Sequence, residues 1–67
     1  MTETYIISDV TAIIRAITSG EFGPTDRNEL ENLHRKVEMV DRPEVRGGLT
    51  ELVSSVQRLG EKYYPEV

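Results

Sequence analysis

The 67-residue chain contains no cysteine and no tryptophan, and it has a single histidine and a single phenylalanine. Without cysteine, neither a disulfide nor a zinc site of the usual Cys/His type can hold the fold together. A domain this small is only marginally stable, because chain entropy opposes folding by roughly 1–2 kcal/mol per residue. The remaining stabilising devices are close helix packing and burial of an apolar surface against another chain.

A basic surface is also missing, since twelve acidic residues outweigh eight basic residues and give a net charge of −4. Binding to DNA or RNA needs a basic field, so the composition disfavours a nucleic-acid partner. An acidic chain suits solubility and a basic protein partner. Long apolar stretches are absent as well, which predicts no signal peptide, no membrane span and a cytoplasmic location.

The first segment repeats apolar residues at spacings of three and four, which is the periodicity of an amphipathic helix. Its apolar positions are Ile6, Ile7, Val10, Ile13, Ile14 and Ile17. The pattern predicts a helix over residues 4–18. Because the segment is rich in β-branched residues, a short strand over residues 4–7 is the alternative.

A loop is predicted next, because Gly20 suits a left-handed helix C-cap and Pro24 cannot continue a helical hydrogen-bond ladder. Phe22 lies between two glycines in this loop. We expect its ring to fold back over the core, with insertion into a partner protein as the alternative.

Asp26 and Asp41 each precede a further apolar repeat and have a glutamate three residues on, which predicts two helix N-caps. The helices that follow are predicted to span residues 26–40 and 43–63. The corner between them is so short that they should be antiparallel or steeply angled neighbours. Residues 1–67 are thus predicted to form one all-α, three-helix domain, a helical hairpin plus an N-terminal helix, that assembles into a larger bundle.

The third predicted helix carries an unbroken apolar heptad, which indicates the side that packs against the other helices. The heptad consists of Val45, Leu49, Leu52, Val56, Leu59 and Tyr63. We expect Leu52, Val56 and Leu59 to lie in the core. Val53 and Tyr64 flank this row, and we expect them to form an association surface.

Gly47 and Gly48 fall in the first turns of the third helix, where each costs about 1 kcal/mol relative to alanine. Close approach of another helix, or a bend that sets residues 43–46 apart as a separate turn, would explain them. Met39 points roughly away from the apolar side of the second helix. It is predicted to be either a frayed-end residue or an exposed contact for a partner.

No pattern in the sequence specifies a catalytic or metal site. His34 borders the apolar side of its helix and is predicted to pack at the core edge with a hydrogen bond. Two acidic pairs, Asp26 with Glu29 and Glu38 with Asp41, are too incomplete and too close together to match the magnesium-binding pairs of helical enzymes. The serines have no partnered base. We therefore predict no enzymatic activity, no cofactor and no metal.

These absences favour a small acidic protein-interaction module, such as an inhibitor, an antitoxin-like protein or an accessory subunit, that binds a larger protein. The predicted partner-binding residues are Val53, Tyr64, Met39 and Phe22. One alternative is a homo-oligomeric structural protein, with a homodimer as the simplest form. Another is a helix-turn-helix DNA binder that uses the second and third helices, which the acidic charge disfavours.

Overall fold

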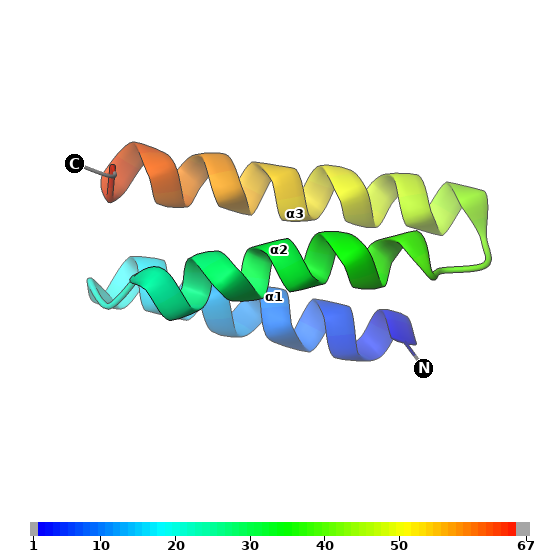
Figure 1. The fold of residues 1–67 in the computed structure, drawn as a ribbon, viewed down its shortest axis with the longest axis horizontal. Coiled ribbons are helices and arrows are strands. Elements are labelled where there is room, and N and C mark those ends of the chain that lie inside the picture. Colours follow the sequence, from blue (N-terminus) through cyan, green and yellow to red (C-terminus); the bar gives the residue numbers. More distant parts are fainter. Residues whose placement is uncertain (1, 66–67) are drawn as a thin grey trace.

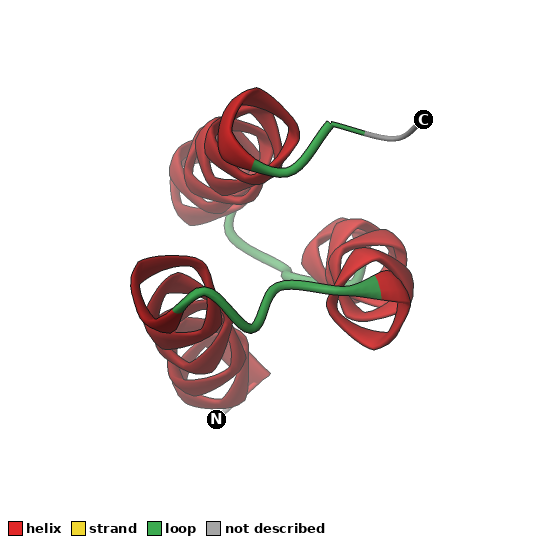
Figure 2. Ribbon diagram, turned by 90° about the vertical axis from the view of Figure 1, so that its left-hand side faces the viewer, coloured by secondary structure: helices red, strands yellow, loops and turns green. Residues whose placement is uncertain are grey.

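Three helices make up the bundle. The computed structural model describes residues 2–65, in the order α1 (Thr2–Ser19), α2 (Pro24–Glu38) and α3 (Pro43–Tyr63). The chain reverses at each loop, so α2 is antiparallel to both neighbours and α1 runs parallel to α3 (Figure 1). Seen along the bundle, the helices occupy the corners of a triangle (Figure 2), and each packs against both others. The predicted all-α, three-helix architecture is confirmed.

None of the three helices is both long enough and apolar enough to cross a membrane.

The N-terminal segment is helical from Thr2, so the strand considered for residues 4–7 does not form. Its β-branched residues do not prevent the helix, because tertiary burial outweighs their modest helix propensity. The end of α1 is as predicted. Gly20 has a positive φ of 78°, its N–H donates to Ile17 O at 3.4 Å, and the next N–H, from Glu21, donates to Ala16 O at 2.9 Å. This pair of bonds is a Schellman motif.

The N-caps predicted for the other two helices are wrong, because each helix begins earlier or later than the aspartate signal indicates. Gly23 is the N-cap of α2, and Asp26 lies in the first turn, where its carboxylate accepts a hydrogen bond from Gly23 N–H at 3.0 Å. Arg42, not Asp41, is the N-cap of α3. In both helices the first residue is proline, whose fixed φ suits this position and whose missing N–H costs little there.

One apolar core joins the helices and the first loop. It contains Ile6, Val10, Ile13, Ile17, Phe22, Leu30, Leu33, Val37, Val40, Leu49, Val53 and Val56. Among the described residues, no buried polar side-chain atom lacks a hydrogen-bond partner. The core is therefore apolar and satisfied, and it has no buried charge that would point to chemistry.

An aromatic cluster closes the end of the bundle where α1 meets α2. Phe22 is buried, as the lid prediction requires, and its ring lies against Gly60 of α3, where an added methyl group would be 2.6 Å from Phe22 Cζ. The Tyr64 ring is 5.7 Å from the Phe22 ring. The Arg27 guanidinium lies over the same Phe22 ring, 5.1 Å from its centre. Tyr64 also donates its hydroxyl hydrogen to Ile17 O at 2.7 Å and accepts a hydrogen bond from Arg27 at its backbone carbonyl.

The two consecutive glycines have neither of the predicted explanations. Helix α3 runs through Gly47 and Gly48 without a separate turn. A methyl group added at either position would meet no heavy atom within 4 Å. No described part of this chain therefore needs glycine at these two positions.

Candidate protein-binding surface

The structure divides the predicted heptad of α3: Leu49 and Val56 are buried together with the flanking Val53, whereas the other large residues of the heptad's second half are exposed. Val53 has 0% exposure, whereas Leu52 and Leu59 are 37% and 38% exposed. The prediction was therefore wrong for these three residues. It was right for Val56, which is buried.

Gly60 explains why the row of Val53 is buried and the row of Leu52 and Leu59 is not. It lies two turns after Val53 on the same side of α3, and a glycine there lets another part of the chain approach the helix closely. Phe22 fills that space. With the row of Val53 and Gly60 facing the core, the row of Leu52 and Leu59 is rotated away from it by about 100° and faces outward.

The structure does not bring the four predicted partner-binding residues into one surface. Val53 and Phe22 are buried, so neither offers a side chain to a partner in this fold. Tyr64 is partly buried within the aromatic cluster. Met39 is exposed, but it is the C-cap of α2 at the opposite end of the molecule (Figure 1).

The outward row of α3 lies beside a similar row on α1, and we call the two rows together the α1/α3 face. The α3 row consists of Gly48, Leu52, Ser55, Leu59 and Tyr63, and the α1 row consists of Ile7, Thr11, Ile14 and Thr18. Their spacings of three and four place each row on one side of its helix. Figure 2 shows α2 at the third corner of the triangle, so α2 does not cover the outer side formed by α1 and α3.

Large apolar side chains are exposed along this face. Besides Leu52 and Leu59, Ile7 is 50% exposed and Tyr63 is 61% exposed. At one end the face is hollowed into a shallow groove of about 440 Å³, lined by Ile17, Thr18, Leu59, Tyr63 and Tyr64. Because this groove takes residues from both helices, it shows that the two rows adjoin.

None of the nine residues of the two rows is charged, although 30% of the chain is charged. Charged side chains border the α3 row, because Arg58 donates to Ser55 Oγ at 3.3 Å and the Lys62 ammonium lies 5.6 Å from the centre of the Tyr63 ring.

Both threonine hydroxyls of the α1 row already have partners. The hydroxyls of Thr11 and Thr18 donate to the carbonyls of Ile7 and Arg15 in their own helix, at 2.8 and 3.0 Å. Covering the face would therefore leave neither hydroxyl without a partner, and the usual penalty for burying a polar group would not arise.

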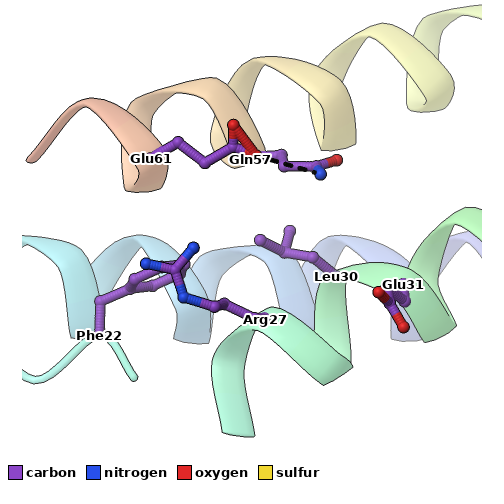
Figure 3. Close-up of a pocket in the computed structure, with 6 residues that line it drawn as sticks. All are labelled: Phe22, Arg27, Leu30, Glu31, Gln57 and Glu61. Atoms are coloured by element: carbon purple, nitrogen blue, oxygen red, sulfur yellow. Dashed lines mark hydrogen bonds between the residues drawn. The ribbon is translucent and has the colours of Figure 1, made fainter. Parts of the chain in front are cut away.

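A second hollow lies between α2 and α3, and Figure 3 shows the side chains around it. It is lined by Phe22, Arg27, Leu30, Glu31, Gln57 and Glu61 and has a volume of about 100 Å³. Ligand sites usually enclose several hundred Å³. This hollow is therefore too small to be the better candidate.

The residues considered for chemistry have structural roles. His34 is partly buried, and its Nε2 lies 2.9 Å from Gln57 Oε1 of α3, which confirms the predicted core-edge packing with a hydrogen bond. Asp26 of the first acidic pair caps α2. Across residues 2–65, no three His, Cys, Asp or Glu side chains are placed to share a metal ion. The absence of a metal requirement stays a prediction.

Comparison with protein-family models, with curated proteins and with solved structures finds no match to this chain.

Proposed function

We propose that this chain is a non-enzymatic protein-interaction module and that its working surface is the α1/α3 face. The observation that carries the proposal is the exposure of Ile7, Leu52 and Tyr63 on one face, whose two rows contain no charged residue. Depletion of charge together with exposed aliphatic and aromatic residues is typical of the centre of a protein interface. Each Å² of apolar surface removed from water contributes roughly 25 cal/mol, so the face gains by being covered.

The larger protein partner expected from the sequence stays a prediction, as does the cytoplasmic location. An inhibitor, an antitoxin-like protein or an accessory subunit would use such a face in the same way, by laying two helices on a partner's apolar surface. The acidic charge of the chain, −4 overall, would then favour basic residues around the partner's binding surface.

The helix-turn-helix alternative has less support. In that motif two helices cross at roughly 90–120° so that the second enters the major groove, whereas α2 and α3 lie alongside each other (Figure 1). Arg46, one of the few cations of α3, is partly buried and donates to Val40 O at 3.1 Å. A gel-shift assay at low salt would reveal any residual DNA binding.

A capture experiment with matched variants tests the proposal. The face variant is Leu52→Lys/Leu59→Lys, and the control is Asn28→Lys/Asn32→Lys, which adds the same charge on the exposed side of α2. We expect tagged wild-type protein and the control to retain the same proteins from an extract of its own cells, and the face variant to lose them at least about tenfold. Circular dichroism checks that both variants are folded. If the face variant captures the same proteins as the wild type, the α1/α3 face is not the working surface.

A further inference from the structure

The spacing of residues along the α3 row suits pairing with a second copy of this chain, and the inference rests on the proposed function. On α3, Leu52 and Leu59 are equally distant from a centre between Ser55 and Val56, and Gly48 and Tyr63 are equally distant from the same centre. We infer that the face binds a second copy of this chain, with the two α3 helices antiparallel across a two-fold axis. Such an interface is self-complementary, because each residue of a pair meets its counterpart on the other copy.

In this pairing, the large side chain of one copy lies opposite a glycine of the other. With the two-fold axis at that centre, Tyr63 of each copy lies over Gly48 of the other, and Leu52 lies against Leu59. Tyr63 is the most exposed large residue of the face, and no heavy atom lies within 4 Å of the place where a Gly48 side chain would begin. Ser55, which is also small, sits at the centre where the helices approach most closely. A glycine that is unexplained within one chain thus has a role between two.

The α1 row repeats the arrangement. Ile7 and Ile14 are seven residues apart, as Leu52 and Leu59 are, and seven residues make about two helical turns. Because α1 runs parallel to α3 (Figure 1), the two-fold axis that reverses α3 also reverses α1. The groove places Thr18 beside Leu59 and Tyr63, so the midpoint of Ile7 and Ile14, about two turns before Thr18, is level with the centre of the α3 row to within about one turn. The axis then brings Ile7 of one copy toward Ile14 of the other, and four helices form a two-layer bundle.

Charges along the outer edge favour the antiparallel direction. Glu51, Arg58 and Lys62 are exposed, and each directly precedes a residue of the α3 row, so all three follow the edge of the face that points away from α1. In the antiparallel dimer, Glu51 of one copy is level with a point midway between Arg58 and Lys62 of the other, about 3 Å along the helix axis from either. A parallel two-fold dimer would place the two charged edges on opposite sides of the interface, so Glu51 would meet neither cation of the other copy.

The available area fits a weak dimer. A face that follows the 36 Å length and 15–18 Å width of the molecule offers on the order of 600 Å² per copy, somewhat below the roughly 800 Å² of a standard interface. We therefore expect dissociation in the micromolar range rather than an obligate dimer.

The first experiment compares neighbouring glycines. Gly48→Gln fills the space required by Tyr63, whereas Gly47→Gln makes the same change, with the same gain in helix propensity, on another side of α3. Sedimentation equilibrium should show wild-type protein with twice the 7.6 kDa mass of one chain at about 100 μM. We expect Gly48→Gln to raise the dimer dissociation constant at least about tenfold and Gly47→Gln to change it less than about threefold. Equal effects of the two changes would overturn the pairing.

The second experiment tests the direction. Glu51→Lys alone and Arg58→Glu/Lys62→Glu alone should each weaken self-association, because each puts like charges opposite one another. An equimolar mixture should form a heterodimer about tenfold more tightly than either homodimer, since every edge contact is again between opposite charges. A mixture that associates no better than its components would overturn the antiparallel arrangement.

Matched controls separate this result from general charge attraction. Glu31→Lys mixed with Arg35→Glu/Arg42→Glu makes the same net charge changes at exposed positions outside the α1/α3 face. We expect this mixture to associate no more tightly than its components.

The inference and the proposed function fail differently. A wild-type monomer at about 1 mM overturns the self-pairing, yet it leaves the interaction module standing if Leu52→Lys/Leu59→Lys still abolishes capture of another protein. If that variant dimerises and captures proteins as the wild type does, both proposals are wrong.

Discussion

At the scale of single residues, Gly60 and Phe22 are a matched pair. A methyl group at Gly60 would lie 2.6 Å from Phe22 Cζ, closer than side-chain carbons normally approach. The Phe22 ring has little freedom to retreat, because the Tyr64 ring and the Arg27 guanidinium pack on it. Glycine at position 60 is therefore a steric requirement of this lid rather than a flexible point in the helix.

Gly60→Ala should destabilise the protein by about 1–3 kcal/mol through overpacking, although alanine is the better helix former. Urea denaturation measures the change. Gly47→Ala is the control, because it has open space and should gain about 0.5–1 kcal/mol from helix propensity alone. Replacing the ring with a smaller side chain, in Phe22→Leu/Gly60→Ala, should recover part of the loss. Equal stabilities for the two alanine variants would show that the lid adapts at no cost.

Leu52 and Val53 are adjacent in sequence, and truncating them should cost different amounts of stability. Val53→Ala removes a side chain with 0% exposure and should cost on the order of 2 kcal/mol through the cavity that it leaves. Leu52→Ala should cost less, about 1 kcal/mol in the monomer, because 37% of this residue is already exposed to water. Urea denaturation at low protein concentration tests both, since dilution removes any contribution from self-association. A larger loss for Leu52→Ala would contradict the placement of the two rows.

At the scale of the helices, the first loop depends on how α1 ends. Gly20 adopts φ 78°, a conformation that costs residues with a side chain about 1 kcal/mol or more. The Schellman bonds of Gly20 and Glu21 turn the chain sharply, so that Phe22 reaches the core only two residues after the helix ends. The position of the Phe22 lid therefore depends on how α1 ends.

Gly20→Ala should lower the free energy of unfolding by about 1 kcal/mol, because alanine disfavours positive φ. Gly20→Asn is the informative comparison, since asparagine adopts this conformation more readily and should lose less. Thermal melting followed by circular dichroism measures both variants. If the alanine and asparagine variants melt together, the left-handed conformation at Gly20 is not what limits stability.

At the scale of the whole molecule, all three helices share one core, and each packs on both others. No helix can therefore separate without exposing core residues of the remaining two. Small domains of this kind unfold in one cooperative step.

Urea unfolding should give coincident transitions by far-UV and near-UV circular dichroism. The far-UV signal reports helix, and the near-UV signal reports the aromatic side chains, of which Phe22 and Tyr64 are the ones packed at the core while Tyr5 and Tyr63 are exposed. If the second copy binds as inferred, the melting temperature should also rise with protein concentration, because only the folded chain dimerises. Gly48→Gln should reduce that concentration dependence. Separate transitions for the two signals would show that the aromatic end opens on its own.

The sequence by itself determined three helices and the approximate position of each. Apolar spacing of three and four, a glycine at position 20 and prolines at positions 24 and 43 are local signals, and their effect on the backbone does not depend on distant contacts. The burial of Phe22 followed from the same reasoning, since a lone aromatic ring in a short loop has an apolar core close by. The N-caps were misplaced because two local signals competed and proline was the stronger.

Only the tertiary structure decided which side of α3 faces inward. The predicted heptad contains both Val56, which is buried, and Leu52, which is exposed, so its regular spacing does not say which side of α3 faces the core. The buried row ends on Gly60, which has no side chain and so adds no apolar residue to the sequence pattern. Glycine is favourable there only because Phe22, 38 residues earlier in the sequence, fills the space. Since that contact exists only after α1 and α3 have come together, no local pattern predicts it, and the exposed α1/α3 face is its direct consequence.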